Sequence, residues 1–364
     1  MARLGDYVKI KTGKLDANAS SENGQYPFFT CSVDPLRIDT YSYDCECVLV
    51  AGNGDLNVKY YNGKFDAYQR TYIIESKDKN ALTVPYLYCF LDDYVEELRK
   101  QSIGGVIKYI KLGNLTEAQI PICSIEKQNE IVENFDKVNT LISLRKQQLS
   151  KLEELVKSRF IELFGDPETN PYDWDQVTVG DVCSSIVRGP FGSALKKEFF
   201  VEPTESTYKV YEQKHAIQKS ATIGTYYVTA EKFAELRRFE CVAGDILMSC
   251  SGTMGELYQL PHGCAKGIIN QALCKFTLND RILPIIFLVY MRQIIGKLET
   301  KGSGIQNIAA VSYVKAMPIN LPPMVIQEQF AAFVEQTDKS KLEIQQSLEK
   351  LETLKKALMQ KYFG

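Results

Sequence analysis

The sequence predicts an α+β protein in which one module, a β-rich domain followed by a long helix, occurs twice. Three observations support this prediction: an internal repeat, short β-branched runs between turn residues in each first part, and an apolar helical stripe in each second part. The chain has 364 residues, enough at roughly 150 residues per domain for two domains and their connecting elements. The repeat period is far too long for a solenoid, so we interpret it as a duplicated domain plus helix.

The repeat is clearest toward the helix ends. Residues 152–157 match residues 351–356 at an offset of 199 residues, and both runs continue to Phe-Gly. Residues 125–128 (Ile-Glu-Lys-Gln) are similar to residues 326–329 (Ile-Gln-Glu-Gln) at an offset of 201, just after an Ile-Pro or Leu-Pro-Pro junction. This difference in offset predicts an imperfect pseudo-twofold repeat.

The second copy is longer than the first. Near the start the offset is only 175 residues, because residues 4–6 (Leu-Gly-Asp) match residues 179–181 (Val-Gly-Asp). We therefore expect about two dozen extra residues between Gly189 and Cys241, within the β-rich part of the second copy.

The first part of each copy carries short apolar and β-branched runs, such as residues 47–51 and 71–74. Gly, Asn and Asp residues separate these runs, for example at residues 52–55, which is typical of strands joined by turns. Shorter helices are expected at residues 85–100 and 284–298.

The second part of each copy is expected to be one helix of about 38 residues, roughly 57 Å long. Its apolar residues keep alternating steps of four and three, the spacing of a coiled-coil seam. The seam residues are Ile131, Phe135, Val138, Ile142, Leu149, Leu152 and Val156 in the first helix, and Phe330, Phe333, Thr337, Ile344, Leu348, Leu351 and Leu358 in the second. We expect the helices to pair as an antiparallel coiled coil with one domain at each end. The alternative is that each helix packs only on its own domain.

The segment between the copies predicts a sharp helix end. Gly165 suits a helix C-cap, and Pro167 and Pro171 prevent the helix from continuing.

Composition limits the class of protein. Apolar residues make up 45% and charged residues 24%, with no long apolar run and no apolar leader, so we expect a cytoplasmic protein without a membrane span. The ten cysteines form no CxxC pair and only two histidines are present, which predicts reduced thiols and no metal site. The net charge of −2 identifies no partner, so a nucleic-acid-binding face would require segregated basic residues.

The sequence lacks the motifs of an enzyme. It contains no GxSxG, no HExxH, no P-loop and no GxGxxG after a strand. Residues 170–172 (Asn-Pro-Tyr) only partly match the catalytic Asn-Pro-Pro-Tyr loop of amino-methyltransferases. The triplet of Asp66, Glu75 and Lys77 has no acidic pair at its counterpart in the second copy. We therefore expect a binding protein without catalytic residues.

Corresponding loops of the two copies carry residues suited to DNA. Glycines allow backbone amides to approach phosphates, lysines neutralise them, and Asn, Gln or Arg side chains can read base edges. In the first copy the candidate DNA contacts are Asn53, Lys59, Lys64, Tyr68, Arg70, Gly105 and Lys108. In the second copy they are Arg188, Ser193, Lys196, Ser251, Thr253, Asn270, Gln271, Ser303, Gln306 and Asn307. For each residue, a solvated turn is the competing interpretation.

Together these features resemble the DNA specificity subunit of Type I restriction-modification systems. The resemblance rests on the paired long helices, the Ile-Pro and Leu-Pro-Pro junctions, the Gln-containing helix starts, and the Phe-Gly-Asp-Pro-x-x-Asn run at residues 164–170. In that family's terms, we assign a first target recognition domain to residues 1–122, a first spacer helix to 123–165, a linker with a second target recognition domain to 166–322, and a second spacer helix to 323–364.

The resemblance implies a division of labour. In that family each target recognition domain reads one half of a split, asymmetric DNA sequence, and the helices set the gap between the halves. The implied partners are double-stranded DNA, two modification subunits that methylate adenine, and restriction/translocase subunits that cleave unmodified DNA in phage defence. S-adenosylmethionine, ATP and Mg would be used by those partners, with no cofactor in this chain. The competing hypotheses are a coiled-coil adaptor with two protein-binding heads and an enzyme in its own right.

Overall fold

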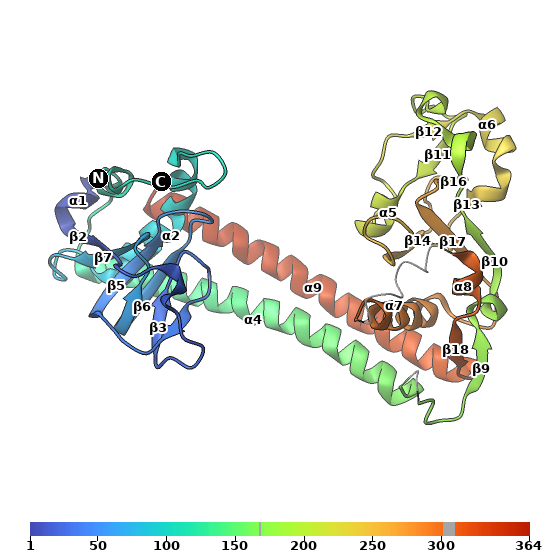
Figure 1. The fold of residues 1–364 in the computed structure, drawn as a ribbon, viewed down its shortest axis with the longest axis horizontal. Helices are drawn as coiled ribbons and strands as arrows, with labels where there is room; N and C mark the ends of the chain where they lie inside the picture. The colour runs from blue at the N-terminus through green and yellow to red at the C-terminus, as the bar shows by residue number, and fades with distance from the viewer. Residues whose placement is uncertain (167–168, 301–309) are drawn as a thin grey trace. The chain divides into compact units, whose positions relative to one another are not determined.

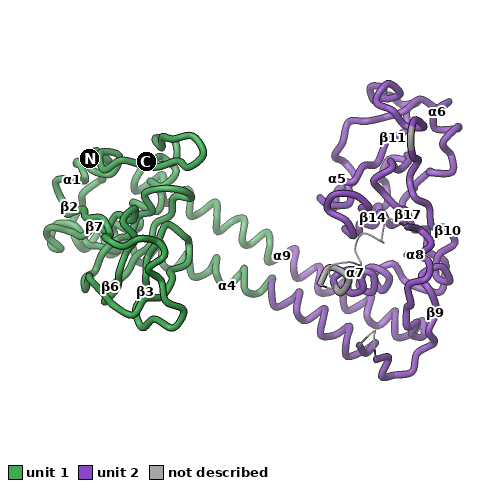
Figure 2. The backbone as a smooth tube through the Cα atoms, in the orientation of Figure 1, with its two compact units in different colours: residues 1–149, 343–364 green, residues 150–342 purple. Residues whose placement is uncertain are grey.

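The structure is a computed structural model that describes residues 1–166, 169–300 and 310–364, apart from the side chains of residues 297–300. It contains two compact units: unit 1 comprises residues 1–149 and 343–364, and unit 2 comprises residues 150–342 (Figure 2). The long helices α4 (Ile125–Phe164) and α9 (Met324–Tyr362) each contribute one part to each unit. The predicted α+β class, with two β-rich domains and two long helices, is confirmed.

Unit 1 is built on a six-stranded sheet with the order β2-β7-β5-β6-β3-β4, antiparallel except for the β3–β6 pair (Figure 1). Side chains alternate between the two faces of a strand. Val48 therefore packs under helix α2 (Val84–Gln101), whereas Cys47 and Leu49 pack in a smaller cluster. The strands are β2 (Val8–Thr12), β3 (Tyr26–Phe29), β4 (Leu36–Ile38), β5 (Tyr43–Ala51), β6 (Val58–Ala67) and β7 (Thr71–Ser76). Unit 1 also contains β1 (Ala2–Arg3), α1 (Leu4–Tyr7), η1 (Ala17–Ala19), α3 (Leu112–Thr116) and β8 (Gln119–Ile120).

Unit 2 repeats the central part of that sheet. Its order β10-β17-β14-β15 corresponds to β2-β7-β5-β6, and all of these neighbours are antiparallel. The strands are β10 (Cys183–Arg188), β14 (Ile246–Ser249), β15 (Leu257–Gln259) and β17 (Leu273–Leu278). A separate pair joins β9 (Asp175–Thr178) to β18 (Pro318–Leu321), as β1 pairs with β8 in unit 1. The helix α7 (Pro284–Thr300) corresponds to α2, and the remaining elements are η2 (Val179–Val182), η3 (Gly192–Leu195), η4 (Lys197–Phe199) and α8 (Val311–Lys315).

The second copy builds an additional sheet with the order β12-β11-β16-β13. Most of its elements fall between Gly189 and Cys241, where the sequence has its extra residues. The elements are β11 (Tyr208–Tyr211), α5 (Gln213–Ile217), β12 (Tyr227–Val228), α6 (Ala230–Glu235), η5 (Arg237–Phe239), β13 (Glu240–Cys241) and β16 (Gly267–Ile269). Among these elements, only β16 comes from outside this segment. It lies in the chain between β15 and β17 of the repeated sheet, so it connects the added sheet to the repeated one.

The two long helices pair antiparallel within each unit. In unit 1, Phe135 stacks on Phe363 with ring centroids 5.9 Å apart, and Lys146 Nζ lies 3.8 Å from Glu352 Oε1. From the first contact to the second, residue numbers rise along α4 and fall along α9, so the two helices run in opposite directions. In unit 2, Phe330 near the start of α9 packs against the rings of Phe160 and Phe164 at the C-terminal end of α4. The alternative in which each helix packs only on its own domain is wrong.

A buried glutamine fixes the start of each long helix. Gln128 and Gln327 are 0% and 1% exposed, and each accepts one backbone hydrogen bond and donates two. For Gln128, the partners are Thr83 N, Ala81 O and Cys123 O. For Gln327, they are Leu283 N, Arg281 O and Pro322 O. All six distances are 2.8–3.0 Å. Each amide side chain thereby joins the segment before α2 or α7 to the first turn of the long helix.

This correspondence corrects the offset deduced for the helix starts. Gln128 is equivalent to Gln327, 199 residues later, and not to Gln329, which lies two positions further on and is exposed. The helices themselves also begin 199 residues apart, at Ile125 and Met324. The similarity of residues 326–329 was misleading because a second glutamine follows the buried one. The helix starts and ends therefore share one offset.

The end of α4 follows the predicted C-cap. Gly165 has φ 77°, and a Cβ there would lie 2.4 Å from Pro171 Cγ, so glycine is required for both conformation and space. Asn170 then holds both backbone groups of Trp174, with Oδ1 accepting from its N and Nδ2 donating to its O. Pro167 lies outside the described residues.

His215 is buried in the additional part of unit 2. Its Nδ1 lies 2.9 Å from Glu212 N and 3.0 Å from Glu212 O, and its Nε2 lies 2.7 Å from Ile223 O. Burial lowers the pKa of His215 below its ordinary value of 6.5. Protonation would place a charge on a fully buried side chain of α5.

We expect Gln327→Ala to lower the unfolding free energy of unit 2 by about 3 kcal/mol, because it leaves one buried N–H and two buried carbonyls unpaired. Gln329→Ala, on the exposed side of the same helix, is the matched control and should change it by less than about 0.5 kcal/mol. Fluorescence of Trp174, the single tryptophan and a residue of unit 2, reports the unfolding in urea. Equal effects of the two substitutions would contradict the assigned correspondence.

We also expect unit 2 to lose stability below pH 6.5. Because the pKa of His215 is lower in the folded state, the unfolded state binds the proton more strongly, so stability is complete above pH 6.5 and falls with decreasing pH. The slope is at most about 1.4 kcal/mol per pH unit. His215→Gln should flatten this dependence in Trp174-monitored unfolding, whereas substitution of the exposed His262 should leave it unchanged. An identical pH profile for both variants would refute the assignment.

Candidate nucleic-acid interface

Most candidate residues of the first copy gather at one end of the central strands of unit 1. Ala51 at the end of β5 pairs with Thr71 at the start of β7, so the loops that follow β5 and precede β7 lie at the same end of these two strands. A cleft of about 520 Å³ opens there. Asn53 and Tyr68 line it together with Ile107, from the loop that follows α2.

Glycines hold these three loops together. Gly52 N donates to Arg70 O at 2.8 Å, and a Cβ on Gly52 would lie 2.3 Å from that oxygen. Gly54, with φ 71°, donates its N–H to Lys108 O at 2.9 Å. The close backbone contacts therefore bring Asn53, Arg70 and Lys108 to one edge, with the side chains of Arg70 and Lys108 exposed. Gly105 lies in the same loop as Lys108.

The two lysines of β6 differ in their surroundings. Lys59, near the cleft, donates through Nζ to Ser32 O at 2.8 Å and also contacts Asn57 Oδ1. Burial lowers the pKa of Lys59. Lys64 lies further along β6, where its ammonium sits 4.7 Å from the ring centroid of Tyr41. Lys64 does not line the cleft.

In unit 2, Arg188 joins two loops at the corresponding edge of the sheet. At the end of β10, its Nε donates to Gln271 O at 3.2 Å and its Nη2 donates to Cys250 O at 3.3 Å. Its guanidinium carbon lies 5.3 Å from the ring centroid of Phe191, an aromatic side chain that is 68% exposed. The next residue, Gly189, has no space for a side chain, since a Cβ would lie 1.9 Å from Asn270 O.

Ser251 and Thr253 belong to the same cluster through Gln213 of α5. Ser251 Oγ donates to Gln213 Oε1 at 3.2 Å, and Gln213 Nε2 donates to Thr253 O at 3.4 Å. The Asn270 side chain accepts from Ala272 N at 3.0 Å, which shapes the turn before β17. Gln213 and Phe191 were not predicted: Gln213 lies in the segment without a counterpart in the first copy, and exposure of one aromatic residue leaves no periodic signal.

Other candidates lie outside this cluster or outside the described residues. Ser193 lies in η3, and Lys196, just after it, pairs with Glu198 at 3.6 Å. Ser303, Gln306 and Asn307 fall in residues 301–309, which the structure does not describe.

The two clusters occupy equivalent places in their sheets. Gly13, after β2, donates to Thr71 O at 3.0 Å, and Gly189, after β10, donates to Leu273 O at 2.9 Å. Both acceptors are the first residues of equivalent strands, β7 and β17. The duplicated sheet therefore presents its polar loops at the same edge in each unit. These loops offer amide, guanidinium and ammonium donors for binding.

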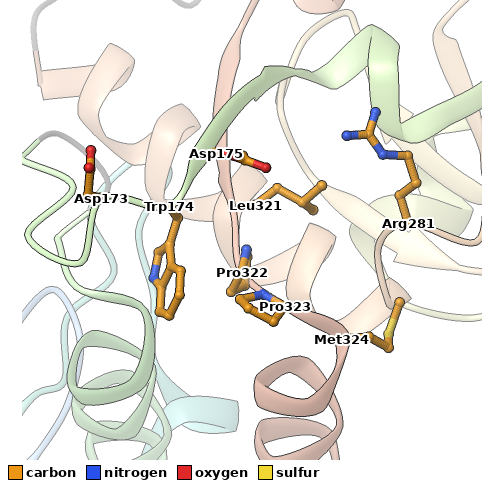
Figure 3. A pocket seen from close by; sticks show the side chains of 8 residues that line it. All are labelled: Asp173, Trp174, Asp175, Arg281, Leu321, Pro322, Pro323 and Met324. Carbon is orange, nitrogen blue, oxygen red and sulfur yellow. The ribbon is translucent and has the colours of Figure 1, made fainter.

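A further cleft of about 480 Å³ lies in unit 2, where the linker meets the start of α9. Figure 3 shows Trp174 beside Pro322 and Pro323 at this cleft, with Arg281 on its other side. The buried Nε1 of Trp174 has no hydrogen-bond partner among the described residues. This cleft contains none of the candidate DNA contacts.

The part of the chain that the structure describes contains no group of three His, Cys, Asp or Glu residues arranged to hold a metal ion. Within the same residues, no helix combines the length and apolar character of a membrane span.

Solved structures with the same fold support this architecture. The crystal structure of the S subunit of a Type I restriction-modification system from M. genitalium is 16% identical, covers 100% of this chain and 95% of that one, and has a TM-score of 0.59. A structure described as the basis of complex assembly and conformational transition of the type I R-M system is 15% identical, with 100% and 96% coverage and a TM-score of 0.59. At this identity the likeness shows the fold alone.

Curated relatives match parts of the chain. The specificity subunit of the Type I restriction enzyme EcoDI from Escherichia coli is 37% identical over 154 residues, which are 42% of this chain and 34% of that protein. The specificity subunit of the enzyme MjaVIII from Methanocaldococcus jannaschii is 26% identical over 202 residues, 53% of this chain and 42% of that protein. The chain thus matches less than half the length of either relative. A family model, the Type I restriction modification DNA specificity domain, matches residues 1–154 and 171–356. Because this match covers most of the chain, the protein belongs to the family of Type I restriction modification DNA specificity domains.

Proposed function

We propose that this protein is the non-catalytic, sequence-specific DNA-binding subunit of a Type I restriction-modification complex, in which each unit reads one half of a bipartite, asymmetric site. One observation carries the proposal: part of the candidate contacts of each copy gathers at the equivalent end of the central strands in two equivalent sheets. Because the loop sequences differ between the units, the two half-sites would differ. Asn53 and Arg70 in unit 1, and Arg188 and Gln271 in unit 2, provide the groups that read base edges.

The proposed partners follow from family membership. Two modification subunits would bind the helical region and methylate adenine with S-adenosylmethionine, and restriction/translocase subunits would use ATP and Mg to cleave unmodified DNA. This chain would hold no cofactor. The net charge of −2 agrees with a subunit whose partners help to enclose the duplex. We place the complex in the cytoplasm.

Methylome sequencing tests the proposal directly. A host without adenine methylation would express this chain with its modification subunit. We expect N6-methyladenine at a split motif with a fixed gap. An assembled complex that leaves all adenines unmodified would overturn the proposal and favour the adaptor with two protein-binding heads. Binding of S-adenosylmethionine by the isolated chain would instead favour an enzyme.

Arg70→Ala and Arg188→Ala should each weaken recognition of a different half-site by about 1–3 kcal/mol, the range for a bidentate contact with guanine. Discrimination at the other half-site should remain unchanged in each case. Arg237→Ala is the control, because this exposed arginine lies in η5 and pairs with Glu240. The measurement is the affinity of the complex for duplexes with single base-pair changes. Unchanged specificity in either variant would remove that arginine from the interface.

Lengthening both helices should change the gap between the half-sites and leave the half-sites themselves intact. One helical turn adds about 5.4 Å. The turn would be inserted after Leu149 in α4 and before Glu343 in α9, the positions at which the units divide. Methylome sequencing of the variant gives the new gap. The same gap as in the parent protein would show that the helices do not determine the spacing.

A further inference from the structure

The loop between α2 and α3 exposes a group of apolar side chains. In residues 103–109, which we call the apolar loop, Val106 is 103% exposed and Ile107 is 63% exposed. Ile103 and Tyr109 are exposed as well, at 43% and 37%. Single exposed apolar residues are ordinary, but four in seven residues on one loop indicate a surface that contacts something.

The base of the apolar loop is held by backbone hydrogen bonds. Ile103 and Tyr109 exchange two N–H···O bonds of 3.0 and 2.8 Å, which close the loop as a short antiparallel bridge. Gly104 has φ 119°, and a Cβ there would lie 2.5 Å from Ile107 O. Beyond the bridge, Ile110 N donates to Gly52 O at 2.9 Å. These backbone hydrogen bonds therefore hold the tip of the apolar loop at a defined position.

The apolar loop forms part of the candidate DNA interface. Ile107 lines the same cleft as Asn53 and Tyr68, and Lys108 places a cation beside the apolar tip. Asp55 also lines the cleft, and its carboxylate lies 3.3 Å from Arg99 Nη2, which offsets its charge. Lys108 and the amide side chain of Asn53 border the apolar tip. This combination suits a nucleic-acid groove, where apolar base surface lies between phosphates.

We propose that the apolar loop enters a groove of the duplex, where Val106 and Ile107 contact the bases of the half-site read by unit 1. This inference rests on the proposed DNA recognition and names a specificity element within it. Two surfaces on bases provide such an apolar contact: the methyl group of thymine and the face of a partly unstacked base step. Both have the same chemistry, and the experiment separates them.

The test uses the full chain assembled with its modification subunits and a duplex that carries the sequence found by methylome sequencing. Val106→Asn combined with Ile107→Asn removes the apolar contact at two exposed positions. Val33→Asn is the matched control, because Val33 is 63% exposed, lies in unit 1 and does not line the cleft. We expect the double variant to bind the duplex roughly tenfold more weakly and to lose discrimination at one or two adjacent base pairs. The other half-site and the control variant should be unaffected.

Two further measurements identify the base surface. If the methyl group is contacted, replacement of thymine by deoxyuridine weakens binding of the parent protein and not of the double variant. If a base step is opened, the parent protein bends the duplex and the double variant bends it less.

Other outcomes overturn the inference. Unchanged affinity and discrimination in the double variant would exclude base contact by the apolar loop, while specific binding by the parent protein would leave the proposed function standing. Loss of assembly with the modification subunits, with DNA discrimination retained, would show a protein-binding loop instead. A parent complex without sequence-specific binding would overturn the proposed function and the inference together.

Discussion

Phe164 and Phe363, at the ends of the two long helices, complete cores that belong to the other copy of the repeat. Phe164, from the first copy, is fully buried in unit 2 against Phe330, and Phe363, from the second copy, is buried in unit 1 against Phe135. Aromatic side chains bury large apolar areas, so neither core is complete without the partner helix. The antiparallel pairing of α4 and α9 therefore forms part of the core of each unit.

The helix starts are fixed as firmly as the helix ends. Gln128 and Gln327 satisfy backbone groups that would otherwise be buried without partners, and a buried unpaired group costs more than an ordinary hydrogen bond contributes. The same amide side chain thus sets where each long helix leaves its β-rich domain. The proposed spacing role requires this property, because a helix can determine a distance only if both of its ends are fixed.

The loops that carry the candidate DNA contacts combine a repeated framework with different side chains. Gly13 and Gly189 repeat the same close backbone approach, whereas the residues that follow the central strands differ between the units. In unit 2, Gln213 of the added segment accepts a hydrogen bond from Ser251 Oγ. Unit 1 lacks a segment that corresponds to the one carrying Gln213. The asymmetric DNA site that we propose agrees with two equivalent sheets that carry unlike loops.

The sequence by itself determined the duplication, the long helices and their seam, because these depend on periodic patterns that survive divergence between the copies. It also placed candidate contacts such as Asn53 and Arg188, since glycine-bounded loops between strands are visible locally. Tertiary structure alone decided that Gln327 and not Gln329 is the buried residue, because two glutamines two positions apart face different sides of a helix. It likewise showed that Lys64 does not line the cleft and that the Arg188 guanidinium lies over the Phe191 ring, because the local sequence does not specify side-chain orientation.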